Sequence, residues 1–398
     1  MSRHQNFWTF TRKTFCKVLA SKYRVTFEEN SDPEPEPPFI LISNHGNFFD
    51  PWILGNYQKT ALNIMMNDDG FRTGAISRWY LNIIGAFAKK KGAQDLQAMK
   101  KTISFLRHKE PVLIFPEGQA TWDGETQPIY GGVERIVKRA KCALVIIRLK
   151  GNFLTRPWWA EHSRRGRISF TRKVYSAKQI AQMDAREIEQ AILDGIYNND
   201  ICDRDNLATT FKGKHLALGA ERFLWTCPAC GEVDSIATSG DDINCIKCGA
   251  TFKLDAHCRV NAADGNLDSP LNLHAWHQRD KQLAREKIAA SNAGEILCQN
   301  TDVTLMTEND ERRFESTDVG VLTLTSDKLS FTSNHDGGEL DFSVEALENV
   351  VVQQKDLFEV TVDGKDYRFN LKGRSPMKWA VFTRYLRGWE EIEKRRVI

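Results

Sequence analysis

Short apolar runs alternate with helical spacings along residues 39–175. Three runs, FILI from Phe39, VLIF from Val112 and ALVIIRL from Ala143, have the length and branching of buried strands. Before the second and third runs, apolar residues recur three or four positions apart, as on one face of a helix: Leu96, Met99, Ile103 and Leu106, then Val133, Ile136, Val137 and Ala140. Strands that alternate with helices predict an α/β layer fold whose core these residues fill.

The first helix predicted, over residues 7–23, has two unlike faces. Aromatic and aliphatic residues fall on one half and mainly basic residues on the other: Phe7, Trp8, Phe10, Phe15, Val18 and Leu19 against Arg12, Lys13, Cys16 and Lys17. Such a helix either lies in a bilayer interface, with its rings in the headgroup boundary, or packs on its own domain. The acidic, proline-rich residues 28–38 that follow predict an extended linker.

From about Asp302 the chain alternates apolar and polar residues at strand spacing, in VTLMT, GVLTLTSDKLSFTS and LFEVTVDGKDYRFNL. Turn residues at 326–327 and 363–364 separate these strands, and a final helix begins after the cap residue Ser375. Strands followed by one helix resemble a pleckstrin-homology (PH) or GRAM-type domain. We therefore expect an all-β PH-like barrel with a C-terminal helix.

The composition is that of a folded protein, but it does not indicate what the protein binds. With 398 residues, 41% hydrophobic and 27% charged, the chain is an ordinary folded protein of two or three domains, and its formal net charge is +3. It lacks an uncharged apolar run of about 18 residues, so no transmembrane helix is predicted. The N-terminus also lacks the apolar core of a signal peptide, which predicts a cytoplasmic location.

Four of the nine cysteines stand in two CxxC pairs, Cys227 with Cys230 and Cys245 with Cys248, each followed by glycine. Four thiolates suit a tetrahedral zinc ion, and the glycines permit the tight turns around it. This pattern resembles a zinc ribbon with a structural zinc and no open position for catalysis; a redox pair would need only one CxxC. Acidic residues between the pairs repel phosphate, so we expect no nucleic acid partner.

Two polar motifs follow the first two apolar runs. His45 and Asp50 come after FILI, and FPEG, residues 115–118, ends the second run. Both lie where predicted strands run out into loops, the position at which α/β sheets carry their chemistry. Asp50 can hold one ring nitrogen of His45 and leave the other free to take a proton. The alternative is a solvated turn in which Asp50 caps a helix that begins at Pro51.

The order of these motifs resembles the glycerolipid acyltransferase family, best known from bacterial 1-acylglycerol-3-phosphate acyltransferase. The resemblance covers residues 39–175 and rests on three blocks: Asn44, His45 and Asp50; Gly85, Phe87 and Lys91; and Phe115, Pro116, Glu117 and Gly118. It implies a mixed-sheet α/β domain that moves a fatty acyl group from acyl-CoA or acyl carrier protein to a hydroxyl. The implied acceptor is a lysophospholipid similar to lysophosphatidate, at a membrane surface.

The resemblance also implies roles for single residues. His45 would be the general base and Asp50 its orienting partner, while Asn44, Lys91, Glu117 and Gly118 would contact substrate. Lys91 stands where relatives usually carry the arginine thought to hold phosphate. The position of the loop, rather than the resemblance, suggests backbone N–H groups around Gly118 as donors to the oxyanion. The family commonly continues FPEG with Thr-Arg-Ser, whereas this chain has Gln119, Ala120 and Thr121. One expected cation is missing, so acyl transfer is implied more firmly than a phosphate-bearing acceptor.

The predicted organisation is a peripheral membrane acyltransferase with accessory modules. An amphipathic helix and linker (1–30) precede the acyltransferase domain (31–222), a zinc ribbon (223–257), a helical linker (258–299) and a PH/GRAM-like domain (300–398). Residues 152–175 interleave tryptophan with basic residues, which beside these motifs favours a membrane surface or an acceptor headgroup. Two other functions stay open: a lipid-binding scaffold that has lost activity, and an acyl-thioester hydrolase that uses water as acceptor.

Overall fold

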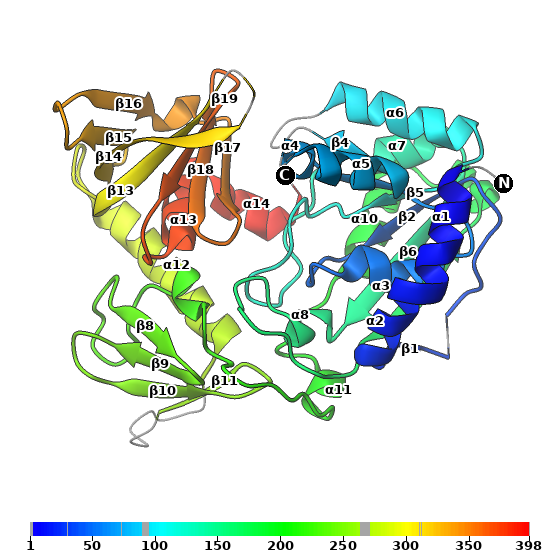
Figure 1. Cartoon of the computed structure of the whole chain (residues 1–398), viewed down its shortest axis with the longest axis horizontal. Helices are drawn as coiled ribbons and strands as arrows, with labels where there is room; N and C mark the ends of the chain where they lie inside the picture. The colour runs from blue at the N-terminus through cyan, green and yellow to red at the C-terminus, as the bar shows by residue number, and fades with distance from the viewer. Residues whose placement is uncertain are drawn as a thin grey trace. The chain divides into compact units, whose positions relative to one another are not determined.

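The computed structural model describes residues 3–29, 31–72, 74–89, 95–262, 271–309, 311 and 313–397. The chain divides into two compact units (Figure 1). Unit 1 comprises Met1–Trp158, Ser163–Gly213 and Arg395–Ile398, and unit 2 comprises Trp159–His162 and Lys214–Lys394. Within the described part of the chain, no helix combines the length and the apolar character needed to cross a bilayer.

Unit 1 is built on a seven-stranded mixed sheet in the order β1-β7-β6-β2-β5-β3-β4. Its strands are β1 Thr26–Phe27, β2 Phe39–Ser43, β3 Asn63–Asn67, β4 Ala86–Lys89, β5 Val112–Ile114, β6 Ala143–Lys150 and β7 Ser169–Tyr175. Only the β6–β7 pair is antiparallel. The three apolar runs are β2, β5 and β6, so the predicted α/β fold with a mixed sheet is confirmed.

Two apolar cores cover the two faces of this sheet, because successive side chains of a strand point to opposite sides. Ile40 and Ile42 of β2 belong to one core and Phe39 and Leu41 to the other. The helices of unit 1 are α1 Arg3–Thr11, η1 Arg12–Cys16, α2 Lys17–Lys22, α3 Asp50–Gly55, α4 Asp69–Arg72, α5 Ala75–Ile83, α6 Leu96–Arg107, α7 Val133–Ala140, α8 Asn152–Thr155, α9 Ala177–Gln182, α10 Ala185–Ile196 and α11 Arg204–Leu207. The core around Ile40 includes residues of α6, α7, α9 and α10, whereas the other includes residues of α1, α2 and α3.

Strands β2 and β5 are parallel neighbours, with Ile42 opposite Ile114. Their carboxyl ends therefore meet at one edge of the sheet, and the loop after β2 lies beside the FPEG loop. The two sequence motifs thus meet because β2 and β5 are neighbours in the sheet. The local sequence of either strand does not specify this order.

The single apolar face predicted for the N-terminal helix is split in the structure. Trp8 and Leu19 are buried, whereas Phe10 and Val18 on the same predicted face are about two-thirds exposed, at 64% and 65%. Cys16, expected on the polar face, is buried. The π-helical turn η1 accounts for the residues that follow it, such as Val18, because its wider turn changes their angular position. Phe10 precedes this turn, so the turn does not account for its exposure.

The first part of unit 2 is a five-stranded antiparallel sheet in the order β12-β11-β10-β9-β8. It consists of β8 Ile236–Ser239, β9 Asp242–Cys245, β10 Thr251–Leu254, β11 Arg259–Ala262 and β12 Leu271–Asn272, after the short helix η2 Ala220–Arg222. Helix α12 (Leu273–Ala290) packs on it through Trp276, whose buried ring meets that of Phe252. Residues beyond 257, predicted as a helical linker, thus contribute strands and a packed helix.

The second part of unit 2 is a seven-stranded antiparallel sheet in the order β16-β15-β14-β13-β19-β18-β17. Its elements are β13 Cys298–Glu308, β14 Phe314–Leu324, β15 Lys328–Ser333, β16 Glu339–Ser343, η3 Val344–Ala346, β17 Asn349–Gln353, β18 Leu357–Val362, β19 Lys365–Asn370, α13 Pro376–Leu386 and α14 Trp389–Arg395. The C-terminal helix α13 packs on the sheet, with Trp379 against Phe358.

The all-β character predicted for this region is confirmed, but the described strands form no closed barrel, because β16 and β17 each pair with one neighbour only. The connection between these two strands holds them apart. Val344 N–H donates to Asp327 O in the β14–β15 turn, and Glu348 N–H donates to Thr361 O of β18. The chain therefore passes from one edge of the open sheet to the other without forming a β16–β17 ladder.

Candidate functional site

The loop after β2 holds His45 with its ring facing Asp50. Nδ1 of His45 lies 2.9 Å from Asp50 Oδ2, and the ring stacks on Phe115 of FPEG with centroids 4.4 Å apart. The His45 side chain keeps 18% of its surface exposed, whereas that of Asp50 is fully buried. One ring nitrogen is thus engaged by the carboxylate while the ring remains accessible from solvent.

Asp50 Oδ2 is the common acceptor of this loop. Besides His45 it accepts hydrogen bonds from Gly46 N–H at 2.8 Å, Asn47 N–H at 2.9 Å and Asn152 Nδ2 at 3.1 Å. Asn152 lies on α8, directly after β6, so the sheet positions it. Because Asp50 Oδ2 lies within hydrogen-bond distance of Nδ1, Asp50 selects the tautomer of His45 that carries its proton on Nδ1. In the neutral ring, Nε2 is then a proton acceptor.

Glu117 of FPEG joins two loops through their backbones. Its Oε1 accepts the N–H of His45 at 2.7 Å and its Oε2 accepts the N–H of Gln127 at 2.6 Å. Burial raises the pKa of Glu117 to about 8, while these hydrogen bonds and the charge of Arg396 lower it and the charge of Asp50 raises it further. Because both oxygens accept backbone N–H groups, the carboxyl group fixes the position of the His45 backbone.

Asn44 and Gly118, also predicted to bind substrate, make hydrogen bonds within the protein. Asn44 is buried and bonds the backbone of Leu149 at both ends of its amide, at 2.9 and 2.7 Å. The N–H of Gly118 donates to Phe115 O at 3.1 Å, and a Cβ on this glycine would lie 2.7 Å from Tyr130. Lys91 lies outside the described residues. Its neighbour Lys89 ends β4 with its ammonium 4.5 Å from the centre of the Tyr130 ring.

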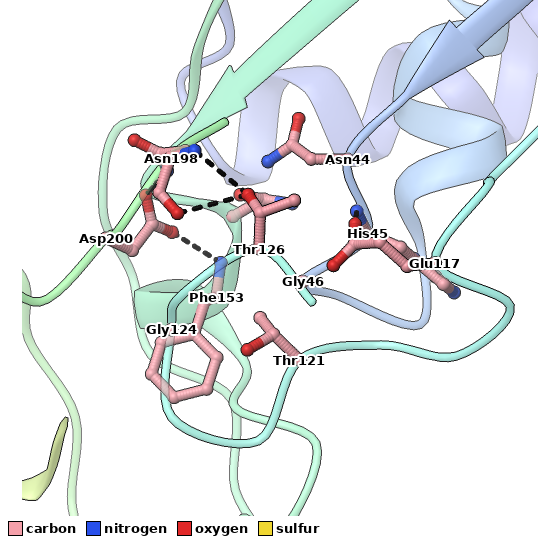
Figure 2. Close-up of a pocket in the computed structure, with 11 residues that line it drawn as sticks. Asn44, His45, Gly46, Glu117, Thr121, Gly124, Thr126, Phe153, Asn198 and Asp200 are labelled. Carbon is pink, nitrogen blue, oxygen red and sulfur yellow. Dashed lines mark hydrogen bonds between the residues drawn. The ribbon is translucent and has the colours of Figure 1, made fainter. Parts of the chain in front are cut away.

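Figure 2 shows a small polar pocket beside the His45 loop, with no room for a bound molecule. His45 and Glu117 line it from one side, and Thr126, Asn198 and Asp200 from the other. Burial raises the pKa of Asp200 to about 6, although its carboxylate accepts the N–H groups of Gly151 and Phe153. The polar lining and small volume indicate an internal support of the loop rather than a chamber for an apolar chain.

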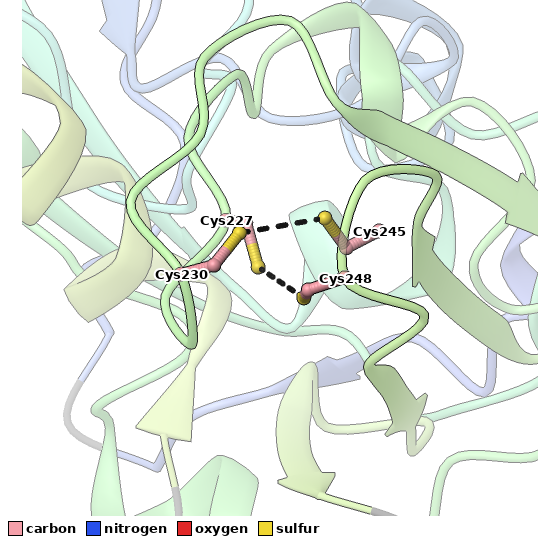
Figure 3. Close-up of side chains that lie close together, drawn as sticks. All are labelled: Cys227, Cys230, Cys245 and Cys248. Carbon is pink, nitrogen blue, oxygen red and sulfur yellow. Dashed lines mark hydrogen bonds between the residues drawn. The ribbon is translucent and has the colours of Figure 1, made fainter.

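The four paired cysteines of unit 2 converge (Figure 3). Their sulfur atoms all lie within 4.8 Å of one another, with Cys227 and Cys248 at 3.9 Å and Cys230 and Cys245 at 3.8 Å. Gly231 and Gly249 have φ values of 75° and 76°, a left-handed conformation that glycine adopts without strain. The four sulfurs could bind a metal ion.

Some contributors to the site carry no sequence signal that we recognised. Asn152 and Arg396 are far from the motifs in sequence and reach them only through the tertiary fold. The position of Asn152 after the third apolar run could have indicated its place near the site, because β6 lies beside β2 and ends at the same edge of the sheet.

Comparisons with known proteins place the two loop motifs within one family region. Residues 22–150 match the Acyltransferase family model. A 1-acyl-sn-glycerol-3-phosphate acyltransferase of Streptococcus pneumoniae is 26% identical over 148 residues, which is 36% of this chain and 54% of that protein. The chain thus spans about half the length of this curated relative. The family match contains both motifs, so the resemblance predicted from them is confirmed.

Two solved structures are each similar to part of the chain. PlsC, the 1-acyl-sn-glycerophosphate acyltransferase of Thermotoga maritima, is 15% identical, with 48% of this chain and 79% of PlsC covered and a TM-score of 0.41. The N-terminal PH domain of human ARAP2 is also 15% identical, with 25% of this chain and 84% of that domain covered and a TM-score of 0.20.

Proposed function

Because residues 22–150 match the Acyltransferase family model, we propose that this chain moves a fatty acyl group from acyl-CoA or acyl carrier protein to a lysophospholipid hydroxyl. The observation that carries the proposal is the Asp50–His45 pair, with one ring nitrogen held and the other available as a base. An alcohol has a very high pKa, so a base that acts during the attack is required for useful rates.

The proposed transfer needs no acyl-enzyme. His45 Nε2 takes the hydroxyl proton as the acceptor oxygen attacks the thioester carbonyl carbon, and Asp50 stabilises the imidazolium that forms. The tetrahedral intermediate then collapses, the C–S bond breaks, and His45 returns the proton to the leaving thiolate. Atoms and charge balance, with a new ester and a free thiol as products.

Backbone donors are proposed to stabilise the oxyanion of this intermediate. Gly118 N–H already donates to Phe115, so we assign the role to the next amides of the loop, those of Gln119 and Ala120. Among the described residues neither amide has a hydrogen-bond partner. Preorganised N–H donors of this kind contribute roughly 3 kcal/mol each to transition-state stabilisation.

The acceptor headgroup is proposed to bind near the end of β4. Lys89 is the described cation of the basic stretch, and Asn67 on the adjacent strand donates from Nδ2 to Gly118 O at 3.3 Å. Burial lowers the pKa of Lys89 and the charge of Asp95 raises it. Lys91 remains a proposed second cation. Both are point charges and suit phosphate with less geometric selectivity than arginine.

The acyl chain is proposed to enter between apolar side chains that enclose almost no free space in this structure, so these side chains must move apart to admit it. Pro51 and Trp52 line this space, directly after Asp50, together with residues of the N-terminal helix, of β3 and of the end of α5: Phe7, Trp8, Thr11, Cys16, Ile64 and Ile84. A fatty acyl chain gains free energy from burial between such side chains at roughly 0.8 kcal/mol per methylene.

Membrane contact is proposed for an aromatic surface made of Phe15, Phe48, Phe49 and Trp52. Phe15 lies 6.3 Å from Phe49 and 6.2 Å from Trp52 between ring centroids, and Phe48 lies 5.7 Å from Trp52. Phe15 and Phe48 are 41% and 49% exposed. Phe48 and Phe49 directly precede Asp50, so insertion of these rings in a bilayer would bring the reacting groups to the lipid.

A Phe15→Ser, Phe48→Ser double variant is expected to bind vesicles of anionic phospholipid at least tenfold more weakly, because burying each phenyl ring contributes roughly 2 kcal/mol. Vesicle co-sedimentation measures the affinity. Leu207→Ser on α11, which removes a similarly exposed apolar side chain, is the control and should bind as wild type does. Equal affinity of the double variant and the control would contradict the proposed surface.

The four-cysteine cluster is proposed to hold structural zinc. Zn–S bonds of about 2.3 Å in a tetrahedron place sulfur atoms about 3.8 Å apart, which matches the Cys227–Cys248 and Cys230–Cys245 distances. Cys227, Cys230, Cys245 and Cys248 would be the ligands. Zinc bound there stabilises the fold and takes no part in the transfer, because four thiolates complete its coordination.

Product analysis tests the proposed reaction. The full chain is incubated with vesicles, radiolabelled acyl-CoA and a panel of lysolipids, and the experiment is repeated with acyl carrier protein as donor. Label in a diacyl lipid is expected and would identify the acceptor. Label only in free fatty acid would favour a thioester hydrolase instead, and the absence of any product with both donors would favour a lipid-binding scaffold.

Asp50→Asn is expected to lower kcat about a hundredfold, because an amide neither selects the Nδ1-protonated tautomer nor stabilises the imidazolium. Because Asp50 acts through His45, its substitution should add almost nothing in a His45→Ala background. Asp194→Asn, which alters a carboxylate on α10 that pairs with Gln190, is the control. Full additivity of the two changes would show that Asp50 acts independently of His45.

A further inference from the structure

Residues 395–397 belong to unit 1, although the chain before them forms unit 2. Ile129 N–H donates to Arg396 O at 2.9 Å, and Ile129 and Val397 form a parallel β-bridge. The side chain of Val397 packs against the core of unit 1 that includes Ile40. This end of the chain is therefore built into unit 1 through both backbone and side chain.

The Arg396 side chain binds the loop that follows FPEG. Its Nη1 lies 3.2 Å from Glu125 Oε1, and its Nη2 donates to Thr126 O. The guanidinium lies 4.8 Å from the centre of the Tyr197 ring, and the Tyr197 hydroxyl donates to the same Glu125 oxygen at 3.0 Å. Arg396 has a φ of 58°, a conformation that costs free energy in a non-glycine residue and persists only where contacts enforce it.

A short path of hydrogen bonds leads from these contacts to His45. Thr126, held by Arg396, precedes Gln127, whose N–H donates to Glu117 Oε2. The other oxygen of Glu117 accepts the N–H of His45. The Glu117 carboxyl group thus accepts N–H groups from His45 and Gln127. The charge of Arg396 favours the ionised form of this carboxyl group, and the charge of Asp50 opposes it.

We propose that Arg396 is a positioning residue for the transfer reaction: it holds residues 125–127 against Glu117 and thereby fixes the backbone from which His45 acts. The inference rests on the proposed function for its consequence in catalysis, whereas its structural part stands on the contacts alone. It gives the last residues of the chain a role in the site that neither loop motif indicates.

The test compares full-length Arg396→Gln, Arg396→Lys and Lys394→Gln. Lys394→Gln is the matched control, because it removes a positive charge two residues away that pairs with Glu390 and Glu391. Hydrogen exchange of the Gln127 and Ile129 amides is measured first. We expect exchange at least roughly tenfold faster in Arg396→Gln than in the control, since these amides would open locally.

The kinetic readout separates positioning from general loss of fold. In Arg396→Gln, kcat for acyl transfer should fall roughly tenfold with KM for the acyl thioester within about twofold, because the base is displaced while the donor site is kept. Arg396→Lys, which keeps the charge, should recover part of kcat.

The two readouts distinguish the failure of this inference from failure of the proposed function. Unchanged amide exchange in Arg396→Gln would overturn the inference whatever the activity. Faster exchange with wild-type kcat would also overturn it, because the loop would then move without effect on the reaction. A wild type that acylates nothing would refute the proposed function, and the exchange result would still decide whether Arg396 holds the loop.

Discussion

Replacing His45 by alanine is expected to lower kcat/KM for acyl transfer by about a thousandfold, the usual contribution of a well-placed general base. The change removes the one side chain proposed to take the acceptor proton and leaves Asp50 with its other donors, Gly46, Asn47 and Asn152. Steady-state kinetics with the best acceptor from the lysolipid panel measures the effect.

A matched histidine variant controls for this substitution. His108 lies at the C-terminal end of α6, where its ring contacts Ser104 O, and it is exposed. His108→Ala should therefore retain kcat/KM within about twofold. Circular dichroism should show both variants folded, since Asp50 keeps its three other donors when the His45 ring is removed. Activity of His45→Ala within about tenfold of wild type would exclude His45 as the base.

Loss of the bound metal is expected to have the largest effect on stability. Elemental analysis should find one zinc ion per chain, and Cys227→Ser should lose it. The thermal unfolding midpoint of unit 2 should then fall by roughly 10 °C or more, because a structural zinc site contributes several kcal/mol to folding. Cys202→Ser, which changes an exposed thiol in unit 1, should leave both metal content and midpoint unchanged.

Loss of the metal should destabilise more than the two cysteine turns, because residues next to these turns make hydrogen bonds to α12 and α13 of unit 2. Trp225 N–H donates to Asp280 of α12 at 3.1 Å, and Trp276 Nε1 donates to Thr226 O at 2.9 Å. Asp234, between the two cysteine pairs, pairs with the buried Lys378 of α13. Full retention of the unit 2 transition in metal-free Cys227→Ser would contradict a structural role for the metal.

The sequence predicted the parts of the site that local pattern controls. His45 and Asp50 are five residues apart at a strand end, and their side chains meet in the structure. Each CxxC pair is likewise local, and the glycine that follows it permits the turn. The β2, β5 and β6 strands were recognisable because each is a short run of apolar residues buried on both faces.

Features that depend on long-range pairing could not be predicted in this way. Asn44 was predicted to contact substrate from its place in the motif. In the structure β2 pairs with β6, and the Asn44 amide makes hydrogen bonds to the Leu149 backbone instead. Glu117 carries the family motif, but only the fold shows that its carboxyl group joins two backbone segments. The N-terminal helix was assigned one apolar face from a regular period, which the π turn at 12–16 breaks. A strand count likewise does not specify whether a sheet closes.

The most direct test of the account measures thiol release from acyl-CoA with and without an acceptor hydroxyl. Wild-type protein and His45→Ala are each given a lysolipid that supports transfer, or the same lysolipid with its free hydroxyl replaced by hydrogen. We expect one thiol per ester formed with wild type and the hydroxyl lipid, and little thiol in the other three reactions. Equal thiol release from the deoxy lipid, or from His45→Ala, would contradict transfer to a hydroxyl with His45 as its base.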